Sequence, residues 1–162
     1  MERTFVFEKL PENVEELRTM PEFALTDPFM TAALTVAALC RYEADPAACT
    51  AMLNELKGPR PLTNYEIQFL RDRLAGKGYK PFSFFEGAMP SNNYTPKQPY
   101  TLTIRDDPYS YQNEGYVRLQ LQSNGADNLR PVTLRQKGNQ WMLWDQMLLS
   151  DIRIPAKDDP WM

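Results

Sequence analysis

The side chains best suited to chemistry gather in "RQKGNQWMLWDQ", residues 135–146. Trp141, Trp144 and Asp145 supply two large aromatic surfaces and a carboxylate within five positions. Such a set suits a ligand platform or an active-site wall, because tryptophan offers apolar contact area and aspartate can bind a polar group or move a proton. It also suits a well-packed hairpin with no ligand. Both interpretations stay open at this point.

The turn of this hairpin decides which face carries these side chains. A two-residue turn at Gly138-Asn139 sets Asp145 opposite Val132, on the same side as Trp141 and Leu143. If that side faces the core, Asp145 could act as a general acid or base in a pocket lined by tryptophan. In the alternative, the strand ends there and the carboxylate reaches water. A three-residue turn would shift the register by one and swap the faces.

Tyrosines form a second candidate site. Six of the eight tyrosines lie between residues 79 and 116, interleaved with Asn, Ser, Gln and Pro. Tyrosine gives rigid contact area, and Ser and Asn give adaptable hydrogen bonds, which is the chemistry of binding loops. The composition predicts a recognition surface on the loops of residues 88–116, formed by Tyr94, Tyr100, Tyr109 and Tyr111. The alternative is that these rings only pin irregular loops to a sheet.

Histidine is absent from the sequence. Its absence excludes imidazole bases, Ser-His-Asp and Cys-His pairs, and metal sites built on histidine. The two cysteines, Cys40 and Cys49, fall inside predicted helices and are expected to be reduced and packed. The carboxylates of residues 106–114 lack the spacing of a calcium loop. We therefore predict no catalytic set, no metal and no cofactor.

Charge and hydropathy limit the expected partners. A net charge of -3 and a pI near 5.1 give no basic footprint for a phosphate backbone, so nucleic acid is not expected. The longest uncharged stretch, residues 28–40, suits a buried helix better than a bilayer span. The N-terminal residues are acidic where an export signal would be basic. We expect a cytoplasmic protein without a membrane segment.

Helices are predicted in the first half of the chain at about residues 12–19, 28–42, 46–57 and 64–75. Asp27-Pro28 and Asp45-Pro46 are typical helix starts, because aspartate caps a free amide and proline has no amide to satisfy. Thr63 and Glu66 have the spacing of a capping box. The helix over residues 28–42 is apolar nearly all round, so it is expected at the centre of the core.

The second half of the chain alternates between apolar and polar residues. The segments "PYTLTIRD", "GYVRLQLQS", "PVTLRQ" and "WMLWDQML" indicate an antiparallel meander of about four strands. Residues 77–98 form a long irregular connector whose phenylalanines are expected to dock on the core. Helices first and sheet second predict one α+β domain over residues 1–162.

Four segments carry a resemblance to a known family. They are "FMTAALTVAALCRY", "MLNELKGPRPLTNYEIQFLRDRL", "NNYTPKQPYTLTI" and "RPVTLRQKGNQWMLWDQMLLSDIRIP". Over residues from about Val14 to Trp161 the chain resembles a family of uncharacterised bacterial domains of unknown function, and the resemblance implies no catalytic residues. The layout is also similar to nuclear-transport-factor-2-like cone folds, in which a pocket between helix and sheet holds ligands or an active site. That second likeness is architectural, and a fold does not fix a function.

These observations favour a binding or protein-interaction module without enzymatic activity, whose surface combines the loops of residues 88–116 with the neighbouring sheet edge. The competing hypothesis is a small-molecule-binding or enzymatic cone that uses Asp145 in a pocket lined by tryptophan. A third is a homo-oligomer, since an exposed strand edge can pair across a twofold axis. The partner would be a protein, a peptide or a small ligand.

Overall fold

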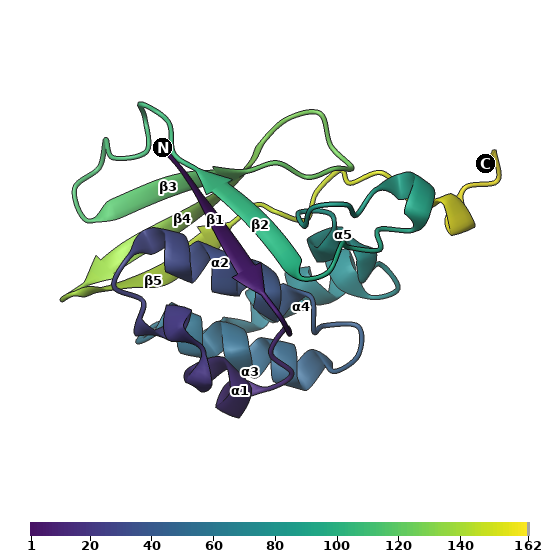
Figure 1. The fold of residues 1–162 in the computed structure, drawn as a ribbon. Helices are drawn as coiled ribbons and strands as arrows, with labels where there is room; N and C mark the ends of the chain where they lie inside the picture. Colours follow the sequence, from purple (N-terminus) through teal and green to yellow (C-terminus); the bar gives the residue numbers. More distant parts are fainter. Residues whose placement is uncertain (162) are drawn as a thin grey trace.

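The computed structural model describes residues 1–161, and Figure 1 shows their arrangement. The helices are α1 (Val14–Thr19), α2 (Pro28–Leu39), α3 (Pro46–Lys57), α4 (Asn64–Leu74) and α5 (Tyr79–Phe82). The strands are β1 (Glu2–Phe7), β2 (Tyr100–Arg105), β3 (Tyr116–Leu121), β4 (Arg130–Lys137) and β5 (Gln140–Gln146). Short 3-10 turns lie at η1 (Pro21–Ala24), η2 (Pro90–Asn92) and η3 (Ala156–Asp158). The predicted α+β class is confirmed.

All four predicted helices are present, and their starts follow the predicted caps. The carboxylates of Asp27 and Asp45 accept amide hydrogen bonds from the first turns of α2 and α3. One end differs, because the helix predicted over residues 28–42 stops at Leu39. The chain there tightens into turns, in which the Tyr42 amide bonds to the Leu39 carbonyl three residues back.

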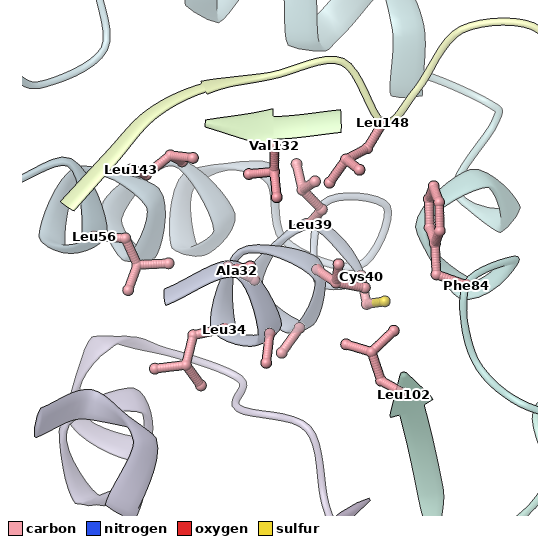
Figure 2. Close-up of a cluster of buried hydrophobic side chains, with 14 of the residues drawn as sticks. Ala32, Leu34, Leu39, Cys40, Leu56, Phe84, Leu102, Val132, Leu143 and Leu148 are labelled. Atoms are coloured by element: carbon pink, nitrogen blue, oxygen red, sulfur yellow. The ribbon is translucent and has the colours of Figure 1, made fainter. Parts of the chain in front are cut away.

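Helix α2 forms the centre of the core, as its composition predicts. Every residue from 31 to 39 is buried. Figure 2 shows α2 side chains between Leu56 of α3 on one side and sheet residues such as Val132, Leu143 and Leu102 on others. The sheet therefore shields one side of α2, and α3 and η1 shield another.

The sheet has five strands in the order β1-β2-β3-β4-β5, and every neighbouring pair is antiparallel. The predicted meander is present in β2 to β5, but the predicted number of four strands is wrong. Strand β1 adds to the edge of β2, with Phe5 opposite Leu102 and Phe7 opposite Tyr100. Its alternation is obscured in the sequence because Val6, on the outer face, is apolar and yet 54% exposed.

The connector over residues 77–98 is less irregular than predicted. It contains α5 and η2, and Phe85 forms a single antiparallel bridge with Leu102 of β2. Phe84 and Phe85 are buried in the core, which confirms that the connector docks through its phenylalanines. The connector is thus held to the core by its phenylalanines, whereas a regular helix or strand is held by apolar residues that recur along one face.

Within residues 1–161, no helix combines the length and the apolar character that crossing a bilayer requires. Both cysteines are buried and unpaired, as predicted for packed thiols.

Candidate functional site

The β4–β5 hairpin begins in the predicted register. Lys137 lies opposite Gln140, and the pairing continues to Leu134 opposite Leu143. A β-bulge follows, in which Trp144 has no partner on β4. A bulge inserts one extra residue into one strand and re-aims the side chains that come after it.

The bulge overturns the predicted position of Asp145. Its Cα lies opposite Thr133 instead of Val132, and its side chain is exposed while Leu143 is buried. Of the two alternatives for Asp145, the exposed carboxylate is therefore the one that the structure shows, and the buried acid beside tryptophan is not present. Asp145 instead lies at the margin of a pocket beside β5.

That pocket, which we call the apolar pocket, lies between α3, α4 and β5 and has a volume of about 270 Å³. Its walls are mostly apolar, and they include Leu53, Leu62, Phe69, Leu70, Leu143 and Met147. Three charged side chains, Lys57, Glu66 and Asp145, complete the lining. An apolar cavity with a few convergent polar groups is the usual form of a small-molecule site.

Lys57, the last residue of α3, is the charged group most deeply placed in this lining. Its side chain is 5% exposed, and its ammonium donates to the Glu66 carboxylate and to the Trp144 carbonyl, both at 3.3 Å. Burial alone would raise the pKa of Glu66, but the Thr63 amide and the Lys57 ammonium outweigh it, so the pKa lies below its usual value. The salt bridge thereby ties the N-terminus of α4 to the bulge in β5.

A second cavity, which we call the Arg–Trp cleft, lies on the other side of Lys57 and has a volume of about 520 Å³. The Arg60 guanidinium carbon lies 4.6 Å from the centre of the Trp144 ring, and that of Arg135 lies 4.7 Å from it. Arg135 is also 5.3 Å from the ring of Tyr116, which meets Trp144 edge to face at 5.6 Å. Two arginines and two aromatic rings thus form one stack on the outer face of the sheet.

The Arg–Trp cleft and the apolar pocket share a wall made of Lys57 and Leu143. The charged residues of the two cavities differ. The cleft is lined by four cationic side chains, those of Lys57, Arg60, Arg135 and Lys137, and by no acidic one among the residues described. The apolar pocket includes two acidic side chains. The two cavities therefore adjoin at Lys57 and Leu143, and cations without acidic side chains line only the cleft.

Gly58 allows the chain to turn from α3 into the Arg–Trp cleft. Its φ is +67°, in the region that favours glycine, and a Cβ built there would lie 2.8 Å from the sulfur of Met142. With a ψ of -126°, the backbone also lies outside the left-handed helical region that other residues can enter, so this conformation requires glycine, and a side chain here would in addition displace Met142. Arg60 reaches Trp144 from the segment that this turn begins.

We expect Gly58→Ala to lower the free energy of unfolding by about 2–4 kcal/mol, from backbone strain and the contact with Met142. Gly76→Ala is the matched control, because Gly76 has a similar φ of +72° and open space around a built Cβ. It should lose only about 1 kcal/mol. Urea titration of both variants measures the difference, and equal losses would show that neither the ψ of Gly58 nor its contact with Met142 adds to the cost of a positive φ.

Trp141 and Tyr111 line a third cavity, which shares no lining residue with the two already described. This cavity is about 350 Å³ in volume and is also lined by Phe29 at the start of α2. The Trp141 amide donates to the Leu25 carbonyl at 2.8 Å, and its own carbonyl accepts from the Thr31 hydroxyl. Trp141 therefore joins the edge of β5 to the helices, and the structure separates it from Trp144 and Asp145.

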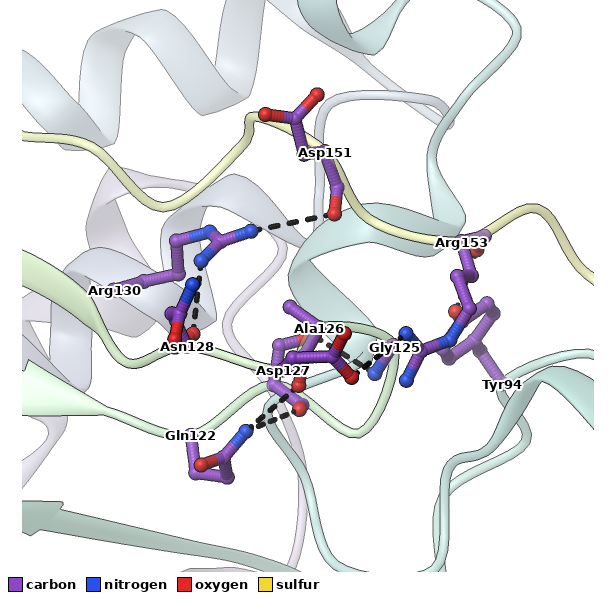
Figure 3. Close-up of polar contacts among 10 residues, drawn as sticks. Tyr94, Gln122, Gly125, Ala126, Asp127, Asn128, Arg130, Asp151 and Arg153 are labelled. Carbon is purple, nitrogen blue, oxygen red and sulfur yellow. Dashed lines mark hydrogen bonds and ion pairs between the residues drawn. The ribbon is translucent and has the colours of Figure 1, made fainter.

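Of the predicted tyrosine surface, two members are packing residues. Tyr94 is 2% exposed, stacks on Tyr79 with 5.3 Å between ring centres, and donates its hydroxyl to the Arg153 carbonyl. Burial raises its pKa to about 12. Figure 3 shows Tyr94 beside Arg153 in the C-terminal segment. Tyr100 is half-buried on β2 and meets Phe85 edge to face. Tyr94 is therefore not part of an exposed surface.

The same segment is held by Arg130, which Figure 3 also shows. Its guanidinium donates to the carbonyls of Asn128, Ser150 and Asp151 at 2.8, 3.1 and 3.3 Å. Its donors are therefore occupied by the backbone, unlike those of the stacked arginines in the Arg–Trp cleft.

The other two tyrosines are exposed on the loop between β2 and β3. Tyr109 is 68% exposed and Tyr111 is 54% exposed. The Tyr111 hydroxyl donates to the Asp106 carboxylate at 2.7 Å. Partial burial and this bond raise the pKa of Tyr111 to about 12. The predicted loop surface is thus reduced to one exposed pair.

Sequence reasoning missed the cationic part of the site. Arg60 stands in "GPRP", which reads as a helix stop, and Lys57 reads as an ordinary charge in the last turn of a helix. Arg135 could have been predicted near Trp144, because the predicted hairpin register places both residues on the outer face. Within the described residues, no cluster of acidic and cysteine side chains is arranged to hold a metal ion.

An α+β domain with a helix enclosed by an antiparallel meander is the class that this geometry defines. A family model described as "Domain of unknown function (DUF6935)" matches residues 9–156. The chain belongs to this family, which confirms the resemblance to domains of unknown function. Neither a search of curated proteins nor a search of solved structures found a match. The likeness to nuclear-transport-factor-2-like cones therefore stays a prediction.

Proposed function

We propose that this protein is a binding module whose site is the apolar pocket between α3, α4 and β5. The observation that carries the proposal is the convergence of Lys57, Glu66 and Asp145 on an otherwise apolar cavity. Ligand sites typically combine apolar walls for affinity with a few fixed polar groups for orientation. The salt bridge between the buried Lys57 and the partly exposed Glu66 holds two of these groups in place before a ligand arrives.

We assign Asp145 the role of a ligand contact. Its exposed carboxylate at the margin of the apolar pocket can accept hydrogen bonds from a ligand. The enzymatic alternative needed a buried carboxylate among tryptophans, whereas Trp144 lines the neighbouring cleft. A binding role requires no buried acid.

The loop of Tyr109 and Tyr111 is a weaker candidate for a partner surface. Both rings are exposed, which supports contact with a protein, but one hydroxyl is already bonded to Asp106. Homo-oligomerisation through a strand edge also stays a proposal. At the edge of β5 the Trp141 amide already donates to the Leu25 carbonyl and the Trp144 carbonyl accepts from Lys57, so β1 is the edge that such pairing would use.

Naphthol, a neutral apolar probe, tests the proposed site. We expect naphthol to bind the wild-type protein in calorimetric titration. Its affinity for the Leu62→Trp variant should be about tenfold lower, or lower still, because the larger side chain fills the cavity. Ile154→Trp is the matched control, since Ile154 is 47% exposed and does not line the apolar pocket. Unchanged affinity in Leu62→Trp, or no binding to the wild type, would refute the apolar pocket as the site.

A further inference from the structure

We propose that the Arg–Trp cleft is an oxyanion site. It would hold the phosphate or carboxylate group of a soluble small molecule whose apolar body lies in the apolar pocket. This inference rests on the proposed function and adds to it the class of ligand.

The first support is that the cations of the cleft lack acidic partners. Among residues 1–161, none of Arg60, Arg135 and Lys137 makes an ion pair within 4 Å, although eight ion pairs exist elsewhere in that range. The chain as a whole carries a net charge of -3. Other cations among the described residues, such as Arg71 and Lys77, also make no ion pair. What distinguishes these three is that they line one cavity whose lining holds no acidic side chain, which favours an anionic occupant.

The second support is the way in which the arginines are held. Arg60 and Arg135 lie 4.6 and 4.7 Å from the centre of the Trp144 ring. A guanidinium that lies over an aromatic ring still has N–H groups that can donate to an oxyanion. Neither guanidinium donates a hydrogen bond to another residue among those described, in contrast to Arg130, which bonds to three carbonyls. The stack fixes the arginines while their donors stay available for an oxyanion.

The third support is the shared wall. Lys57 and Leu143 line both cavities, so an oxyanion in the cleft lies next to the apolar pocket. The cleft, at about 520 Å³, has room for a phosphate or carboxylate group together with its water. A ligand with one anionic group and one apolar body matches both halves.

Two probes with the same ring system separate the oxyanion from the apolar body. Naphthyl phosphate should bind at least tenfold more tightly than naphthol in calorimetric titration, and its affinity should fall as salt is added. If naphthol binds and naphthyl phosphate binds no more tightly, the oxyanion site is refuted while the proposed pocket stands. If neither probe binds, both proposals fail.

Arginine variants test the assignment to the cleft. We expect Arg60→Gln and Arg135→Gln each to lower the affinity for naphthyl phosphate about tenfold or more. The affinity for naphthol should not change in either variant. Arg118→Gln, which removes the same charge from exposed β3, should bind both probes like the wild type. Equal losses in Arg118→Gln would point to diffuse charge and overturn the assignment. Thermal melts monitor folding, and Arg60→Lys, which keeps the charge without the planar fork, should retain part of the affinity.

A vesicle experiment distinguishes a soluble ligand from a lipid head group. We expect no co-sedimentation with phosphatidic acid vesicles at protein concentrations that saturate naphthyl phosphate. Binding to the vesicles without binding of naphthyl phosphate would contradict a soluble ligand.

Discussion

Leu34→Ala is expected to lower the free energy of unfolding by about 2–5 kcal/mol. Leu34 lies in α2, is fully buried, and belongs to the main hydrophobic core. Its truncation removes apolar contacts and leaves a cavity that the surrounding helices and sheet fill only in part. Chemical denaturation followed by circular dichroism measures the change directly.

The control makes the same chemical change outside the core. Leu129 is 37% exposed, so Leu129→Ala should cost less than about 1 kcal/mol. A loss at Leu34 no larger than the loss at Leu129 would show that α2 does not lie at the centre of the fold. The comparison removes effects that alanine exerts on the unfolded chain.

The second large effect concerns the salt bridge between Lys57 and Glu66. We expect Glu66→Gln to cost about 2–3 kcal/mol, because it leaves a nearly buried ammonium with only the Trp144 carbonyl as a partner. The value is smaller than for a fully buried pair because the Glu66 side chain is 35% exposed. Glutamine is still suited to the capping box with Thr63, so the variant changes the charge and preserves the cap.

Lys57→Met is the counterpart that removes the other charge. It should cost only about 1 kcal/mol, mainly for the lost hydrogen bond to the Trp144 carbonyl, because Glu66 keeps its contact with water and with Thr63. The asymmetry between the two variants is the diagnostic quantity. A larger loss in Lys57→Met than in Glu66→Gln would contradict a buried lysine that depends on its carboxylate.

The same pair predicts a pH dependence. The pKa of Glu66 in the folded protein lies below its usual value of 4.5, so the carboxylate binds protons more weakly in the folded state than in the unfolded state. Its contribution to stability is therefore fully present above pH 4.5 and is lost as the pH falls through the lower, folded pKa. Stability measured from pH 7 downwards should decline less steeply in Glu66→Gln than in the wild type.

The helices could be predicted because their signals are local. Asp27 and Asp45 cap helices through bonds to amides only two or three residues away, and an all-apolar segment can only be stable when enclosed. The hairpin register was predictable for the same reason, since a two-residue turn fixes the pairs that follow it. It held from Lys137 to Leu134.

The remaining features depend on contacts between distant parts of the chain. At the bulge, Trp144 contacts Lys57 from α3 and Arg60 from the loop that follows α3. The residue spacing in β5 gives no information about where these two side chains lie. Strand β1 exists because β2, about a hundred residues away, offers it an edge. Tyr94 was predicted on a surface because its neighbours are polar, yet its ring packs against the C-terminal segment.

Backbone amide NMR during a titration with naphthyl phosphate reports where on the molecule the ligand binds. We expect chemical-shift changes concentrated in residues 53–70, which run from α3 into α4, in residues 135–137 of β4 and in residues 141–147, together with the side-chain indole of Trp144. Changes concentrated in the loop of residues 106–115, or an unchanged spectrum at saturating probe, would contradict a site formed by the apolar pocket and the Arg–Trp cleft.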